Sequence, residues 1–185
     1  MIVLLVGGSG SGKTTVCRTL CGLAQGAGFV VAGVVTLPRY VAGEKVGLDV
    51  QDARTGDVRA LAESKRPAGG PDVGSWHFHR SGLEWSADVL CAIRRCDLLV
   101  IDELGPLELI RGEGWQVGLE VLRSDVYDLA VVAIRPSLES RIRERLGGLQ
   151  AVTLMVTTAN RDALPGRICA LCQKTGTGGM QQRIL

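Results

Sequence analysis

The sequence predicts an α/β fold, a three-layer arrangement in which a mostly parallel sheet carries helices on both faces. Short continuous apolar runs, such as residues 2–6 and 98–101, are typical of strands buried on both faces of a parallel sheet. These runs alternate with segments of helical periodicity, which indicates helices packed against a sheet. The 185-residue chain, with 46% hydrophobic and 22% charged residues, has the composition of one globular domain.

The first predicted elements are two buried strands separated by a helix. Residues 2–6 form a strand that ends at a Gly-Gly pair. Residues 13–25 carry apolar side chains on one helical face, and the Gly-Ala-Gly sequence that follows ends the helix. Residues 29–36 form the second strand, which we expect the following Leu-Pro-Arg sequence to break.

The region of about residues 40–80 changes in character and predicts an insertion with antiparallel structure. Residues 44–63 alternate apolar and polar positions around an Arg-Thr-Gly-Asp turn, which is typical of a β-hairpin. Residues 65–75 are rich in glycine and proline and predict a loop. The Trp-His-Phe-His sequence that follows predicts a short strand. We expect the hairpin to lie within or beside the main sheet.

The rest of the chain returns to alternating strands and helices. Apolar runs predict strands that end at Asp102, at Arg135 and at Thr157. Helical periodicity predicts helices over four segments, which are residues 82–95, about 115–126, 137–146 and about 161–173. We assign residues 1–174 to a single domain and residues 175–185, which lack a pattern, to a flexible tail.

A glycine-rich loop follows the first strand and carries the first functional motif. Gly7-x-x-x-x-Gly12-Lys13-Thr14 matches the phosphate-binding loop, and it lies between a strand and a helix, as that motif requires. Glycines let the backbone wrap phosphates, and the N–H groups at the helix start point at negative charge. We expect Lys13 to reach the β- and γ-phosphates and act in catalysis, and the Thr14 hydroxyl to hold Mg²⁺. The expected nucleotide-binding residues of this loop are Gly7, Gly8, Ser9, Gly10, Ser11, Gly12, Lys13, Thr14 and Thr15.

Two adjacent carboxylates follow a later apolar strand. Asp102 stands at the carboxyl end of that strand, where phosphate-loop proteins place the aspartate that bonds to the magnesium shell. Glu103 directly beside it can orient and activate a water molecule for attack on the γ-phosphorus, which makes it a candidate catalytic residue. The alternative is that Glu103 is a solvated residue at the start of a loop.

Three further candidates lie at strand ends, where an open parallel sheet binds its ligands. Arg135 either neutralises charge on the transferring phosphoryl group, as a catalytic residue, or is a structural arginine before a helix start. Asn160 and Arg161 follow the last strand and can contact the nucleoside base, the first by hydrogen bonding and the second by stacking. The alternative for Asn160 is an N-cap of the last helix.

Composition and charge exclude several classes of partner. A net charge of +2 is too small to indicate a nucleic-acid partner, and no apolar run approaches the roughly 20 residues of a membrane span. The N-terminus lacks the basic leader and cleavage site of a signal peptide, so we expect a cytoplasmic protein with free thiols. Nothing in the sequence identifies a protein partner.

One cysteine pair has a spacing that also occurs in metal sites. Cys169 and Cys172 form a C-x-x-C sequence, but a zinc site needs about four ligands and there is no second cysteine pair. His77 and His79 could complete a set; the alternative is that both histidines lie at the surface.

The motifs together resemble those of the small P-loop nucleoside-triphosphatases. The resemblance covers residues 1 to about 168 and rests on GGSGSGKTT, on GVVT followed by GEKVGLDV, on CDLLVIDELGPLEL and on VTTANRD. It implies a P-loop NTPase fold and slow, magnesium-dependent hydrolysis of ATP, GTP and other nucleoside triphosphates with broad base tolerance. It also implies a catalytic carboxylate at Glu103. The chain departs from the family at its TLPRY sequence, where an acidic residue is common, and at Pro106-Leu107, where a Lys-Met pair is common.

Three functions are consistent with these residues. The first is hydrolysis of a nucleoside triphosphate, with Glu103 positioning the water, and the resemblance favours it. The second is a small-molecule or nucleotide kinase, which needs a second pocket and an arginine-rich lid. Residues 141–148 resemble such a lid, although their charges also fit a solvated helix face. The third is a nucleotide-gated binding switch with its partner surface in the region of residues 44–80.

Overall fold

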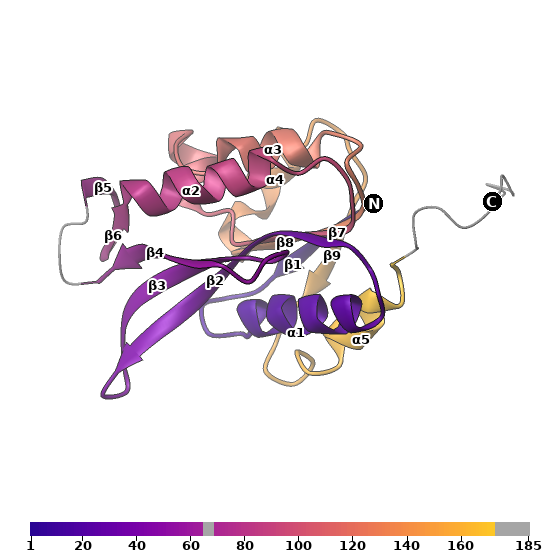
Figure 1. The fold of residues 1–185 in the computed structure, drawn as a ribbon, viewed down its shortest axis with the longest axis horizontal. Coiled ribbons are helices and arrows are strands. Elements are labelled where there is room, and N and C mark those ends of the chain that lie inside the picture. The colour runs from indigo at the N-terminus through magenta and orange to yellow at the C-terminus, as the bar shows by residue number, and fades with distance from the viewer. Residues whose placement is uncertain (65–68, 173–185) are drawn as a thin grey trace, which may run out of the picture.

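The protein forms three layers around one sheet (Figure 1), and the computed structural model describes residues 1–64 and 69–172. The helices are α1 (Lys13–Gly26) and α5 (Leu164–Cys169) on one face, and α2 (Arg80–Cys91), α3 (Gln116–Leu122) and α4 (Glu139–Arg145) on the other. The prediction of an α/β fold with helices on both faces is confirmed. The predicted domain end at residue 174 and the predicted tail at residues 175–185 lie outside the described residues.

The sheet of the described residues is mixed. Its order is β5-β6-β4-β3-β2-β7-β8-β1-β9. The strands are β1 (Ile2–Val6), β2 (Val31–Val41), β3 (Glu44–Asp52), β4 (Val58–Glu63), β5 (Gly69–Val73), β6 (Trp76–His79), β7 (Cys96–Asp102), β8 (Tyr127–Ile134) and β9 (Ala151–Met155). From β2 through β7, β8 and β1 to β9 every pair is parallel, whereas from β2 through β3, β4 and β6 to β5 every pair is antiparallel. The expectation of a mostly parallel sheet therefore holds for one half only, and the predicted hairpin extends the same sheet.

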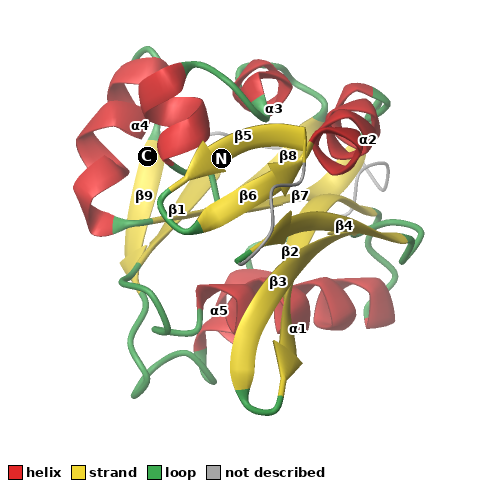
Figure 2. Ribbon diagram, turned by 90° about the vertical axis from the view of Figure 1, so that its left-hand side faces the viewer, coloured by secondary structure: helices red, strands yellow, loops and turns green. Residues whose placement is uncertain are grey.

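The second strand continues through the sequence that was expected to break it. β2 pairs with β7 over Val31–Val34 and with β3 from Val34 to Val41. Pro38 lies opposite Leu48 of β3, in the part of β2 that has a neighbour on one side only. Because proline lacks only the N–H group, a strand tolerates it where one side is not paired. The long β2–β3 hairpin projects from the layered body (Figures 1 and 2).

The predicted loop at residues 65–75 is partly wrong. Gly69–Val73 forms the strand β5, which pairs with β6, and residues 65–68 lie outside the described residues. A Cβ atom at Gly70 would lie 2.4 Å from the carbonyl oxygen of Phe78, so glycine allows the two backbones to approach. The glycines that suggested a loop instead permit a close strand pair.

The last helix is shorter than predicted. The segment of residues 161–173 begins with turns, and α5 starts only at Leu164 and ends at Cys169. The short π-helical turn Leu107–Arg111 was not predicted, and the helix predicted for residues 137–146 begins with a 3₁₀ turn, Pro136–Leu138, before α4. No helix in residues 1–64 and 69–172 is long and apolar enough to cross a membrane.

The apolar core has two parts, one on each face of the sheet. Residues that alternate along β1 point to opposite sides, so that Leu4 belongs to the part of the core on the side of α2, α3 and α4, while Leu5 belongs to the part on the side of α1. Cys17 and Cys21, one helical turn apart in α1, are buried in the part of the core on the α1 side. Both faces of the parallel half are thus covered, which leaves the edge at its carboxyl ends for polar side chains.

Candidate active site

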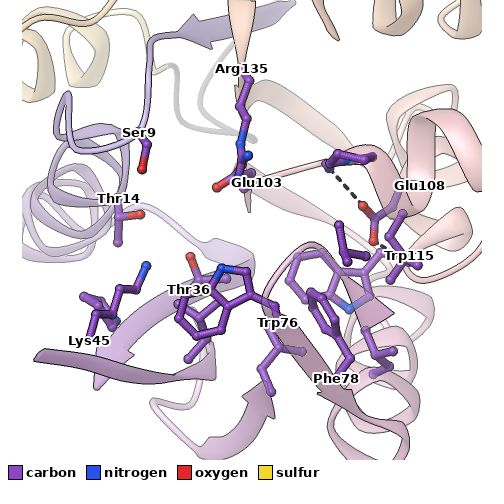
Figure 3. Close-up of a pocket in the computed structure, with 18 residues that line it drawn as sticks. Ser9, Thr14, Thr36, Lys45, Trp76, Phe78, Glu103, Glu108, Trp115 and Arg135 are labelled. Atoms are coloured by element: carbon purple, nitrogen blue, oxygen red, sulfur yellow. Dashed lines mark hydrogen bonds and ion pairs between the residues drawn. The ribbon is translucent and has the colours of Figure 1, made fainter. Parts of the chain in front are cut away.

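The sheet brings the expected site residues to one edge. The glycine-rich loop joins β1 to α1, Asp102 ends β7, and Arg135 directly follows β8. Because β7, β8 and β1 are neighbours in parallel, their carboxyl ends lie together. Figure 3 shows Arg135 pointing to Glu103, with Thr14 on the other side of the cleft.

The glycine-rich loop requires glycine at two of its positions. A Cβ atom at Gly7 would lie 2.4 Å from Ser11 Oγ, and Gly12 has a φ of 103°, which favours glycine. Lys13, only 7% exposed, donates from Nζ to the carbonyl oxygens of Gly7 at 2.7 Å and Gly8 at 3.0 Å. The ammonium group thus lies folded against the loop that it is expected to complete.

Asp102 is buried between β7 and β2. Its Oδ2 accepts hydrogen bonds from Thr36 Oγ1 at 2.9 Å and Thr36 N at 3.3 Å. Burial raises the pKa of Asp102 to about 6, although the nearby hydroxyl of Thr14 and the hydrogen bonds from Thr36 act in the opposite direction. Within the described residues, the buried Oδ1 has no hydrogen-bond partner. A buried carboxylate oxygen without a partner, near a threonine hydroxyl, is the kind of oxygen that Mg²⁺ binds.

Glu103 has an uncommon backbone conformation. Its φ is 111°, in a region that residues other than glycine rarely adopt. The side chain is partly exposed, and its Oε1 accepts a hydrogen bond from Arg135 Nε at 2.7 Å. Two residues that were expected to act on the same phosphate are therefore paired with each other. Glu103 is therefore not simply a solvated residue at the start of a loop, which was the alternative interpretation.

Lys45 and Trp76 are cleft residues that the sequence analysis did not identify. Lys45 lies in β3 and shares the cleft with Thr14 and Glu103, and its Nζ is 5.0 Å from the centre of the Trp76 ring. Burial lowers the pKa of Lys45, while the charge of Glu103 acts to raise it. Lys45 is part of the GEKVGLDV sequence, but that sequence does not place it in the cleft, because its position depends on how the inserted strands fold back over the cleft.

Glu108 fixes the loop that follows Glu103. It is buried, and its two carboxylate oxygens accept hydrogen bonds from Gly105 N at 2.9 Å and Trp115 N at 3.1 Å. Burial raises the pKa of Glu108. The carboxylate thus ties the loop after β7 to the residue before α3. Glu108 is part of the GPLEL sequence, but its backbone partners could not be read from that sequence.

The two residues expected at the base lie in the turn after β9. Asn160 Oδ1 accepts a hydrogen bond from Thr157 N at 2.9 Å, and Asn160 Nδ2 donates to Met155 O at 2.8 Å. The amide therefore closes a turn, and since α5 begins at Leu164, Asn160 is not its N-cap. Arg161 packs on the glycine-rich loop, because a Cβ atom at Gly12 would lie 2.5 Å from Arg161 Cδ.

The C-x-x-C sequence forms no metal site with the histidines. Cys169 and Cys172 are free thiols that pack against the core beside α1. His77 pairs with Asp72 at 2.8 Å on the other half of the sheet. Across residues 1–64 and 69–172, no group of three or more histidine, cysteine or acidic side chains could hold a metal ion.

Comparison with known sequences gives one family over nearly the whole chain. The profile of the family described as NTPase matches residues 2–169. The protein named nucleoside-triphosphatase THEP1 of Methanosarcina acetivorans is 35% identical over 170 residues, which cover 90% of this chain and 93% of the relative. The protein of the same name from Thermofilum pendens is 35% identical over 167 residues, with 89% and 91% covered.

Comparison with solved structures supports the same fold. The crystal structure of THEP1 from the hyperthermophile Aquifex aeolicus superposes with a TM-score of 0.71 at 18% identity, covering 94% of this chain and 100% of that one. The solution structure of a human cancer-related nucleoside triphosphatase gives a TM-score of 0.69 at 24% identity, with 91% and 95% covered. At these identities the likeness concerns the fold.

Proposed function

The chain belongs to the NTPase family and is a nucleoside-triphosphatase, and from that membership we propose that it hydrolyses magnesium-bound nucleoside triphosphates with Glu103 positioning the water. One observation carries this proposal. Asp102 turns into the protein toward Thr36, whereas the next residue, Glu103, turns toward Arg135 in the cleft through its positive φ. Two adjacent carboxylates at the same strand end therefore point in different directions, which suits them to different roles.

The inward carboxylate suits the magnesium shell. Thr14 and Asp102 would hold the ion, since both offer oxygen and one Asp102 oxygen is buried without a partner among the described residues. The bound ion would neutralise charge on the β- and γ-phosphate oxygens. A bound ion also favours the charged form of Asp102, whose pKa burial raises to about 6.

The outward carboxylate suits the water. The γ-phosphate would draw Lys13 from its carbonyl partners and Arg135 from Glu103, since both cations then meet a stronger anion. Glu103, freed from the ion pair, accepts a proton from water as the water oxygen attacks the γ-phosphorus. The bond to the bridging β-phosphate oxygen breaks, and Arg135 stabilises the charge on the transferring group. The products are the diphosphate and phosphate.

Broad base tolerance fits the turn after β9. The Asn160 amide already has backbone partners at both ends, which leaves it poorly suited to select one base edge. Arg161, packed on the loop, offers a flat guanidinium on which any base can stack. We therefore expect ATP, GTP and other triphosphates to serve as substrates.

The test is phosphate release from several nucleoside triphosphates with Mg²⁺, comparing wild type with Glu103→Gln. We expect the amide to lower kcat by at least about 100-fold, because it cannot accept a proton. Nucleotide binding, measured by titration calorimetry, should be largely retained. Glu120→Gln, an exposed change on α3, is the matched control and should behave as wild type. Wild-type turnover by Glu103→Gln would refute the assigned role.

A further inference from the structure

The cleft continues beyond the position expected for the γ-phosphate into an apolar chamber. The cavity has a volume of about 260 Å³, and the glycine-rich loop contributes only Ser9 and Thr14 to its wall. Its other end is formed by Trp76 and Phe78 of β6 and by Trp115, which precedes α3 (Figure 3). One end of the cavity is therefore polar and charged, and the other is aromatic.

A phosphate cannot account for the aromatic end. An anion placed against apolar side chains loses its hydration without gaining partners, which is costly. The phosphate chain is expected to follow the glycine-rich loop and the base to lie near Arg161, which packs on Gly12 and does not line the chamber. The aromatic end thus has a shape and chemistry suited to a second molecule.

The polar groups at the aromatic end already have partners within the protein. Trp115 donates its indole Nε1–H to Ser86 Oγ at 2.7 Å. Both Glu108 carboxylate oxygens accept backbone N–H groups, from Gly105 and from Trp115 itself. An occupant therefore needs no polar group at that end. At the other end it meets Glu103, Arg135 and Thr14, together with Lys45, whose Nζ lies 5.0 Å from the centre of the Trp76 ring.

These walls define the occupant as a flat apolar body with one polar group at the end facing Glu103. An apolar cavity of about 150 Å³ is enough to hold benzene, so one of this size accepts one or two fused rings with a short substituent. Trp76 and Phe78 offer aromatic surfaces, which favour rings. When nucleotide is bound, the cations are used by phosphate, so a neutral hydroxyl fits the polar end better than a further anion.

We propose that this chamber binds a small aromatic alcohol and that its hydroxyl accepts the γ-phosphoryl group in place of water. The inference rests on the proposed function, since it uses the same Glu103 and the same nucleotide site. The alcohol oxygen forms a bond to the γ-phosphorus as the bond to the bridging β-phosphate oxygen breaks, and the diphosphate leaves with that electron pair. Glu103 takes the hydroxyl proton. The product is a phosphate monoester. When no alcohol occupies the chamber, water accepts the phosphoryl group and the reaction is hydrolysis.

The test uses a matched pair of probes, naphthylmethanol and methylnaphthalene, which share a body and differ in the hydroxyl. Wild-type full-length protein is incubated with Mg²⁺ and ATP labelled at the γ-phosphate. We expect naphthylmethanol to lower phosphate release saturably while labelled naphthylmethyl phosphate appears. Methylnaphthalene should form no product and should compete with naphthylmethanol. If naphthylmethanol has no saturable effect, or lowers release without giving the labelled ester, the proposal is wrong.

Two variants locate the effect. Leu83→Trp places an indole in the chamber and should lower ester formation by about tenfold or more, the equivalent of losing one decade of affinity. Val73→Phe fills it from β5 and replaces the first variant if that one does not fold by circular dichroism. Trp85→Phe is the control, because Trp85 lies outside the chamber against Arg59. Ester formation that the filled variants leave unchanged would overturn the proposal.

The two proposals fail in different ways. Absence of phosphate release from wild type without any probe would contradict the proposed hydrolysis. Normal release that depends on Glu103, together with no ester, would contradict only the acceptor chamber.

Discussion

Asp102, the proposed magnesium ligand, is buried in a way that costs the folded protein stability. Its carboxylate is fully enclosed and hydrogen-bonded through only one of its oxygens among the described residues. Burial raises its pKa from 3.8 to about 6. Between these two values the folded protein holds a proton that the unfolded chain releases, so the folded state loses stability as the pH rises.

A pH dependence of stability follows for the metal-free protein. In chelator, the free energy of unfolding should lose a contribution on the order of 3 kcal/mol between about pH 4 and pH 6, since each pKa unit corresponds to about 1.4 kcal/mol. Asp102→Asn should lack this contribution. Urea unfolding as a function of pH measures it, with the exposed Asp125→Asn as control. Equal pH profiles for wild type and Asp102→Asn would contradict the assignment.

Glu103 combines a candidate catalytic side chain with an unfavourable backbone. At a φ of 111° a Cβ atom is crowded, and such conformations cost about 1–3 kcal/mol. Glu103→Gly should therefore be more stable than Glu103→Ala by about 1–2 kcal/mol, the reverse of the usual order of these residues. Both variants lose the ion pair with Arg135, so that loss cancels in the comparison. Chemical denaturation of the two variants decides it.

For single residues, the sequence predicts the site residues that belong to contiguous motifs and misses those that only the folded structure brings into the cleft. The glycine-rich loop and the Asp102-Glu103 pair are each contiguous in the sequence, so the sequence alone was enough to predict them as candidate site residues. Lys45 and Trp76 reach the same cleft from inserted strands, and no periodicity reports on that contact. The pairing of Glu103 with Arg135 joins residues that are 32 positions apart, and no sequence pattern indicates it.

Among the elements, β2 has the strictest requirements. Gly33 lies where β2 pairs with β7, with a φ of 119°, and a Cβ atom there would lie 1.9 Å from Val100 O. The carbonyl oxygen of Gly33 also accepts a hydrogen bond from Ala53 N at 2.9 Å, which ties the end of β3 to β2. The close approach of two strands at this point is open only to glycine.

Gly33→Ala should lower the free energy of unfolding by about 3 kcal/mol or more, because the methyl group meets backbone that cannot move away easily. Gly22→Ala is the matched control. It lies within α1, is exposed and has no atom near a built Cβ, so it should stabilise by about 0.5–1 kcal/mol. Thermal and urea unfolding of both variants test this. A neutral Gly33→Ala would show that the strand contact is looser than described.

Element prediction succeeded where one strand or helix is decided by its own pattern. The buried strands of the parallel half and the hairpin of residues 44–63 are of this kind. It failed where a neighbouring strand determines whether a segment forms a strand. Pro38 is tolerated because only β3 pairs with that part of β2, and the strand β5 exists because β6 lies beside it. Both partner strands were predicted, but the local sequence does not show which strands lie side by side.

For the whole molecule, the candidate site is built from segments that lie far apart in the sequence. The loops after β1, β7 and β8 and the strand β2 all contribute to it, so bound nucleotide should connect both halves of the sheet. A ligand that binds only the folded state at 100 times its Kd adds about 2.7 kcal/mol, which for a chain of this length raises Tm by about 5–10 °C.

We expect this rise with Mg²⁺ and a slowly hydrolysed triphosphate analogue, and a much smaller one when a chelator replaces Mg²⁺. Asp102→Asn should lose the magnesium-dependent part, whereas Glu103→Gln should keep it, since Glu103 is assigned to the water and not to the ion. Differential scanning calorimetry provides the measurement. A full Mg²⁺ effect in Asp102→Asn would remove that residue from the proposed metal shell.

The β2–β3 hairpin also offers an engineering route. Its tip at Ala42 and Gly43 is exposed and projects from the body, and exposed tips tolerate inserted domains. In the same β2 strand, Thr36 donates its backbone N–H and hydroxyl to Asp102. A fluorescent reporter spliced into the tip would therefore share one continuous strand with the carboxylate assigned to the ion. The chain thus provides a scaffold for an optical sensor of nucleotide concentration.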